Sequence, residues 1–216
     1  MITINKNNTH YTLEGNTNCL YLNELFTSLI DTNLLPCAFV GNNQLHFHAQ
    51  SVVLLDDFFV NKTINYGYED ALFTLYSLSK QIISLENMGL TFYGFGPKDI
   101  IVVNNTYFFL LNTNKLFLIE NNNLTFLTPF SKPYFASPEL LNIHTLPSSI
   151  SFKSIYYSLG VLIIQCLFDN YILKGNEIKS DEEIDTIIKP IKETKLYWCL
   201  KRCLEIDTND RYLLFI

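Results

Sequence analysis

The stretch Phe135-Ala-Ser-Pro-Glu-Leu-Leu141 lies just past the middle of the chain and decides how the flanking sequence is interpreted. A helix is predicted to begin at Pro138, which places Glu139 in its first turn. A carboxylate is stabilised there by the exposed backbone N–H groups and by the helix dipole. The helix is predicted to continue to His144.

Three other stretches stand in a consistent order around this one. They are PKDIIVV (Pro97–Val103), SIYYSLGVLIIQCLF (Ser154–Phe168) and CLEIDTNDR (Cys203–Arg211). Together with SPELL (Ser137–Leu141) they resemble four protein kinase motifs, and they occur in the order that the family has. PKDIIVV resembles the end of the catalytic loop and SPELL the A-P-E motif. SIYYSLGVLIIQCLF resembles the central buried helix, and CLEIDTNDR the C-x-x-x-D-P-x-x-R run. The resemblance covers about residues 68–216. It implies an α+β, protein kinase-like fold with a small β-rich N-lobe and a mainly helical C-lobe.

The resemblance also implies a structural ion pair. In protein kinases the Glu of the A-P-E motif and the Arg near the domain end form a buried pair that anchors the activation segment. Here these residues are Glu139 and Arg211, and Arg211 is one of only two arginines in the chain. A planar guanidinium can hold a carboxylate through two hydrogen bonds. The alternative is two unrelated surface charges, and either outcome concerns the fold rather than catalysis.

Residues 1–66 are expected to form a reduced N-lobe of mixed β and α structure, and residues 67–216 the C-lobe. A helix is expected at 21–31, with Asn23 as a potential N-cap. The runs bounded by turn residues predict strands at 10–15, 36–40, 44–50 and 51–60.

The second part opens with a helical apolar stripe over 68–89 that ends at Gly89. Strands at 99–103 and 106–111 should form a hairpin around Asn104-Asn105. A second hairpin is expected around residues 120–123, and the serine-rich stretch 146–154 reads as a loop. Further helices are predicted at 154–168, 182–189 and 193–205.

The groups that grip phosphate in a kinase N-lobe are absent from this sequence. Phosphoryl transfer depends on positioning and charge stabilisation by a glycine-rich loop and a strand lysine. Only Gly15 and Gly41 precede Gly67, and they are too far apart for a G-x-G-x-x-G loop. Lys6 and Lys62 are the only lysines before Lys80, and neither lies on the expected third strand.

The catalytic loop is degenerate in the same way. Alignment on Pro97 puts Gly94 where the family has the catalytic Asp and Gly96 where it has the Lys. Tyr93 replaces the Arg, and Ile155 replaces the Asp that supports the loop. A hydrogen atom can be neither a base nor a cation, so the loss should cost several powers of ten in rate.

Two residues that could supply oxygen ligands to a metal ion remain, but Asp and Asn have exchanged places relative to the kinase motifs. Asp99 stands where the family has the metal-binding Asn, and Asn112 stands where it has the Asp of D-F-G. Together they offer a carboxylate and an amide oxygen, which Mg²⁺ can use as ligands. The alternative is two polar turn residues beside a strand, and no bound ATP, Mg²⁺ or other cofactor is expected.

Other metal-ligand pairs have simpler explanations. His46 and His48 alternate on one predicted strand face, and Cys199 and Cys203 share one helical face. Strand histidines without Cys or acidic neighbours are usually structural, and free cysteines are commonly buried. No metal site is therefore predicted.

Composition limits the classes of partner and compartment. The net charge is −6 and the charged fraction is 17%, which does not supply the basic face that nucleic-acid binding needs. Five cysteines without regular spacing argue against a disulfide framework. No apolar run is long enough for a membrane span, and no signal peptide is visible. A soluble, reducing compartment, cytoplasm or nucleus, is expected.

These observations favour a catalytically inactive, pseudokinase-like protein that binds protein partners as a scaffold subunit of an assembly. The alternatives are an atypical serine/threonine-type phosphotransferase and an ATP-binding regulatory module. Both of these would use Asp99 and Asn112.

Overall fold

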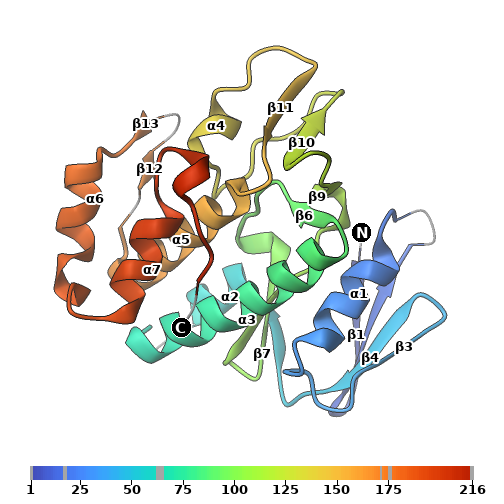
Figure 1. Ribbon diagram of the computed structural model, residues 1–216. Helices are drawn as coiled ribbons and strands as arrows, with labels where there is room; N and C mark the ends of the chain where they lie inside the picture. The colour runs from blue at the N-terminus through green and yellow to red at the C-terminus, as the bar shows by residue number, and fades with distance from the viewer. Residues whose placement is uncertain (1, 17–18, 62–65, 171, 175–176, 215–216) are drawn as a thin grey trace.

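The computed structural model describes residues 2–16, 19–61, 66–170, 172–174 and 177–214 (Figure 1). Within these ranges the chain has seven α-helices and thirteen strands in five small sheets. The α+β class expected from the sequence is therefore confirmed. None of the described helices is both long enough and apolar enough to cross a membrane.

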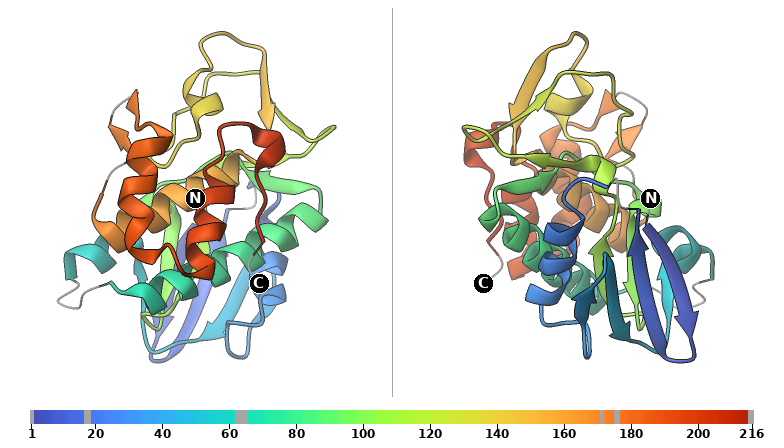
Figure 2. Two further views of the ribbon diagram at one scale, coloured as in Figure 1. Left: turned by 60° about the vertical axis from the view of Figure 1, so that its left-hand side comes forward. Right: turned by 90° about the vertical axis from the view of Figure 1, so that its right-hand side faces the viewer.

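A four-stranded antiparallel sheet forms the N-terminal end of the molecule (Figure 2). Its strands, in spatial order, are β1 (Ile2–Asn7), β2 (His10–Gly15), β4 (Gln44–His48) and β3 (Phe39–Gly41). Alternate side chains such as Leu13, Leu45 and Phe47 are fully buried on one face, and the other face is open to solvent. The sequence analysis missed the edge strand β1, five of whose six residues are exposed.

Helix α1 (Leu22–Asp31) packs on the inner face of this sheet through Leu22, Phe26 and Leu29. The expected cap at Asn23 is wrong, because Tyr21 occupies the N-cap position and Asn23 lies inside the first turn. At the other end of the helix, the Ser84 hydroxyl donates to Asp31 at 2.7 Å. This bond ties the N-terminal part to the long helix that follows.

The strand expected at 51–60 is also wrong in its second half. Only β5 (Val52–Leu54) is extended, and α2 (Leu55–Asn61) follows it directly. Asp56 and Asp57 fall in the first turn of α2, where carboxylates are favoured. The continuous apolar run concealed this boundary, since such a run fits a strand and a buried helix equally well.

Helix α3 (Tyr68–Asn87) is the central element, with the first sheet on one side and the C-terminal helices on the other (Figure 1). Its buried stripe includes Leu75, Leu78 and Ile82. The buried Gln81 amide donates to the Leu110 carbonyl and accepts from the Leu110 N–H, both at 2.8 Å. One side chain thus fixes the position of the neighbouring strand.

That strand belongs to the predicted hairpin of β7 (Ile100–Val103) and β8 (Tyr107–Leu110), which the structure confirms. Asn104 and Asn105 have φ values of 54° and 56°, the left-handed conformation that tight hairpin turns require. Side chains on one face of the hairpin join the core around α3, and those on the other face join the core under the first sheet. The hairpin therefore forms the wall between the two cores.

The second predicted hairpin does not form. The strands β9 (Leu116–Leu118) and β10 (Asn123–Phe126) separate after the turn; β9 pairs with β6 (Leu90–Phe92) and β10 with β11 (Ser148–Ser151). The stretch 146–154 therefore contains a strand where a loop was expected. Pairing with β11 buries Leu124 and Phe126 in a third apolar cluster. This burial depends on residues that are far apart in the sequence, so local patterns do not predict it.

The C-terminal part is mainly helical. It contains α4 (Pro138–Leu141), α5 (Ser154–Phe168), α6 (Asp181–Ile188) and α7 (Lys195–Cys203), with a short hairpin of β12 (Leu173–Lys174) and β13 (Glu177–Ile178). Helix α5 has the bounds predicted for it, and its first eleven residues are buried. At Gly160 an added Cβ would lie 2.9 Å from Leu204, so the glycine allows the last helix to approach α5 closely.

A partly buried acid between α3 and α5, Glu86, should make stability depend on pH. The Tyr156 hydroxyl donates to Glu86 Oε2 at 3.0 Å, and burial raises the pKa of Glu86 to about 7. The folded protein therefore holds a proton that the unfolded chain releases near pH 4.5, so stability falls as pH rises from about 4.5 to 7. We expect Glu86→Gln to be more stable than wild type by about 1–3 kcal/mol at pH 8 and nearly equal at pH 4.5.

Urea unfolding at pH 4.5, 6 and 8 measures this difference. The exposed Glu193→Gln is the matched control and should follow wild type throughout. A Glu86→Gln variant that follows wild type at every pH would contradict the assignment.

Candidate functional site

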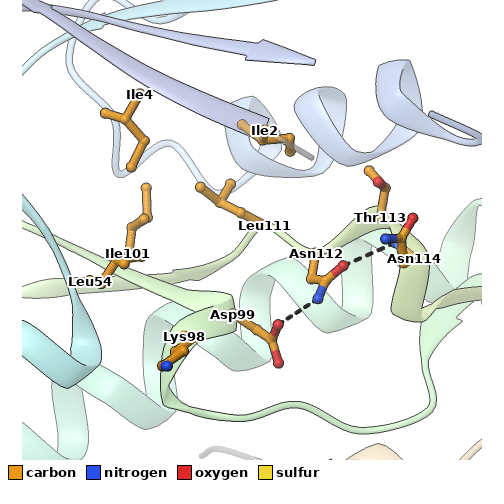
Figure 3. Close-up of a pocket in the computed structure, with 10 residues that line it drawn as sticks. All are labelled: Ile2, Ile4, Leu54, Lys98, Asp99, Ile101, Leu111, Asn112, Thr113 and Asn114. Carbon is orange, nitrogen blue, oxygen red and sulfur yellow. Dashed lines mark hydrogen bonds between the residues drawn. The ribbon is translucent and has the colours of Figure 1, made fainter. Parts of the chain in front are cut away.

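A cavity of about 330 Å³ opens between the edge strand β1 and the β7–β8 hairpin (Figure 3). One wall is aliphatic and consists of Ile2, Ile4, Leu54, Ile101 and Leu111. The opposite wall is polar and contains Lys98, Asp99, Asn112, Thr113 and Asn114. Ligand pockets commonly start at about this size, so the cavity is the candidate site.

Asp99 is the one buried acid of the polar wall. It ends the 3₁₀ turn η1 (Pro97–Asp99) and is 9% exposed. Its Oδ2 accepts from the Gly96 N–H at 2.7 Å and from the Lys115 ammonium at 2.6 Å. Its Oδ1 accepts from the Asn112 amide at 2.6 Å. The structure thus brings Asp99 and Asn112 into direct contact.

Asn112 is oriented by the turn that follows it. Its Oδ1 accepts from the Asn114 N–H at 3.1 Å, which caps the 3₁₀ turn η2 (Thr113–Lys115). The same turn returns Lys115 toward Asp99, and the two form an ion pair. Lys115 is a site residue that sequence reasoning missed. The available signal was a lysine three positions after an Asn that can cap a turn.

Gly94 and Gly96 lie beneath the segment that precedes α4. The backbone N–H of Phe135 donates to the carbonyl of Phe95 at 2.9 Å. A Cβ added at Gly94 would lie 2.6 Å from Pro133 Cγ, and Gly94 has a φ of 155°. A Cβ at Gly96 would lie 3.2 Å from Tyr134 Cβ. Gly94 therefore has no room for a side chain unless Pro133 moves, and a side chain at Gly96 would press against Tyr134.

Tyr93 is part of an aromatic cluster rather than of the cavity. Its ring makes edge-on contacts with Phe117, Phe126 and Phe130 at centroid distances of 5.2–5.6 Å. Burial raises the pKa of its hydroxyl, which donates to the Ser131 carbonyl. Tyr93 therefore has a packing role in this cluster.

The structure brings Glu139 and Arg211 together as a bidentate ion pair. The two guanidinium nitrogens of Arg211 lie 2.6 and 3.0 Å from the Glu139 oxygens. Arg211 is fully buried and also donates to the carbonyls of Glu205 and Ile206. Its Cζ lies 5.0 Å from the centre of the Tyr157 ring. This single cation therefore joins α4, α5 and the segment after α7.

The first sheet offers few cationic groups. Lys6 on β1 is the one lysine of its four strands, and its ammonium lies 5.5 Å from the Tyr11 ring centre. Lys62 lies outside the described residues. Within the described sheet, strands β2, β3 and β4 supply no lysine to the cavity.

The histidine pair of the sequence is a triplet in space. His10 on β2 lies 5.5 Å from His46 and 5.1 Å from His48, measured between ring centres, on the outer face of the sheet. The sequence pattern missed His10 because the pairing of β2 with β4 is long-range. Cys199 and Cys203 are buried in α7. In the described parts of the chain, no three His, Cys, Asp or Glu side chains are arranged to hold a metal ion.

No protein-family model matches the chain, and a search of curated proteins finds no match.

Removal of the buried guanidinium should strongly destabilise the protein. Arg211→Ala strands the Glu139 carboxylate and empties a fully buried site, and we expect a loss of about 3–5 kcal/mol in the free energy of unfolding. Urea denaturation measures it. Lys201→Ala is the matched control, because it removes the partly exposed ion pair with Asp185 and should cost less than about 1 kcal/mol. Equal losses in the two variants would contradict the anchoring role of Arg211.

The lack of space for a side chain at Gly94 can be tested separately. Gly94→Ala forces a methyl group against Pro133, and we expect a loss of about 1–3 kcal/mol. Gly41→Ala is the control, since a Cβ there meets nothing within 4 Å and should change stability by about 0.5 kcal/mol or less. A Gly94→Ala variant as stable as wild type would show that the position can accept a side chain.

Proposed function

We propose that the chain is a protein kinase-like protein that has lost catalysis and acts by binding protein partners as a scaffold subunit. Residues 1–66 would be the reduced N-lobe, a sheet with one helix, and residues 67–216 the C-lobe. The four motif stretches support this relation, because each lies on the kind of element that its motif implies. Pro97–Val103 leads into a buried strand, Ser154–Phe168 is a buried helix, and Glu139 contacts Arg211.

The observation that carries the loss of catalysis is the packing at Gly94. The proposed relation puts the catalytic base at this position, where the Pro133 ring leaves no room for a Cβ. General acid–base groups typically contribute a factor of about 10²–10⁴ in rate. Phosphoryl transfer without a base, a strand lysine or a glycine-rich loop would lack most of its machinery.

Exposed apolar side chains support a role in protein binding. Phe39 and Val40 are exposed on the edge strand β3, and Trp198, Ile206 and Tyr212 are more than half exposed in the C-terminal part. Aromatic side chains are enriched at protein interfaces. The partner would be a protein met in a soluble, reducing compartment, and neither a nucleic acid nor a membrane is proposed.

A second candidate is a nucleotide-binding module or an atypical phosphotransferase. One observation favours it: Asp99 and Asn112 do meet, and they line the same cavity. Such a module would bind ATP in this cavity, next to Asp99 and Asn112.

Two measurements on one sample separate these functions. We expect no rise in melting temperature with ATP and Mg²⁺, because the phosphate-gripping groups are missing, and no labelled product from γ-labelled ATP. A melting shift without transfer would replace the scaffold proposal with the nucleotide-binding module. Transfer that is lost in Asp99→Ala would establish the phosphotransferase instead.

A further inference from the structure

Lys115 neutralises Asp99, the only acid among the described residues that line the cavity. The two side chains are 14% and 9% exposed, and Lys115 Nζ lies 2.6 Å from Asp99 Oδ2. The proposed kinase relation puts a metal ligand at Asp99. We infer that the Lys115 ammonium is a tethered cation that takes the place of a divalent metal ion beside Asp99.

The orientation of Asn112 supports this inference. Mg²⁺ is bound through oxygen ligands, but Asn112 presents its NH₂ group to Asp99. The backbone N–H of Asn114 identifies the other amide atom as the oxygen, and this oxygen accepts within the η2 turn. The second ligand that the sequence offered to Mg²⁺ is therefore turned toward the backbone.

The position of Lys115 is fixed by backbone as well as by charge. Its carbonyl accepts from the Tyr93 N–H at 3.1 Å, and its N–H donates to the Asn112 carbonyl at 3.1 Å. The next residue begins β9, which pairs with β6. Lys115 is thus held between two paired segments, unlike a surface lysine that samples many rotamers.

Charge makes the two cations mutually exclusive. An ammonium in contact with Asp99 repels a divalent ion that approaches the same carboxylate, and partial burial strengthens the repulsion. The residues present therefore do not fit Mg²⁺. The cavity would then hold no metal ion. This inference rests on the proposed scaffold function and adds that the function needs no metal.

Rescue by a free cation tests the inference on the whole 216-residue chain. Lys115→Ala leaves Asp99 without its cation, so we expect a lower melting temperature than wild type. We expect Mn²⁺, used as the probe, to raise the melting temperature of this variant by about 2–4 °C. Wild type and Lys98→Ala should not respond, since Lys98 lines the same cavity but is exposed. The double variant Asp99→Asn/Lys115→Ala should not respond either.

An equal Mn²⁺ shift in wild type, or a folded Lys115→Ala that ignores Mn²⁺, would overturn the inference. If Lys115→Ala does not fold, amine labelling of wild type decides: Lys115 should react more slowly than Lys98, with or without Mn²⁺. Faster labelling of Lys115 in Mn²⁺ would show that the metal displaces it, which contradicts the tethered cation. Phosphate transfer by wild type, by contrast, would refute the proposed function without changing these results.

Discussion

The fold depends on the neutralisation of one fully buried cation. Arg211 is the largest side chain with no exposed surface, and a charge removed from water requires a partner and hydrogen bonds. Glu139 supplies the countercharge from α4, two carbonyls after α7 accept further N–H groups, and the Tyr157 ring of α5 faces the guanidinium. These contacts come from segments up to 72 positions apart in the chain. The helical part must therefore close around Arg211 in one arrangement.

A second buried charge sits in the cavity and is also neutralised from within the chain. Asp99 and Arg211 are the only buried charged side chains among the described residues. The first is paired with Lys115 and the second with Glu139, so neither depends on an added ligand. The Asp99 carboxylate of the polar wall is therefore already paired, and Pro133 and Tyr134 pack against the glycine positions beside it. Both features support the proposal that the chain has lost catalysis.

The sequence predicted the elements that local patterns control. Helix α5 has the predicted bounds because it is apolar on all sides, and the β7–β8 hairpin forms because two Asn residues accept a positive φ. Two errors arose where long-range pairing decides: β1 is a mostly exposed edge strand, and β10 pairs with β11 instead of with β9. A third arose because Asp56 and Asp57 begin a helix inside an apolar run that fits a strand equally well. In the site, the motif alignment named Asp99 and Asn112, but not Lys115. Lys115 reaches the site only through the η2 turn, whose one sequence signal is the capping Asn112 three positions earlier.

The central proposal is that Lys115 occupies the place beside Asp99 that a divalent metal ion would take in the proposed kinase-like site. A crystal structure of the protein soaked with Mn²⁺ and a non-hydrolysable ATP analogue tests this most directly, because manganese is located by its anomalous scattering. The account predicts no manganese peak in the cleft and Lys115 Nζ still in contact with Asp99. A manganese peak between Asp99 and Asn112 with a triphosphate bound to it, and Lys115 displaced, would contradict the account.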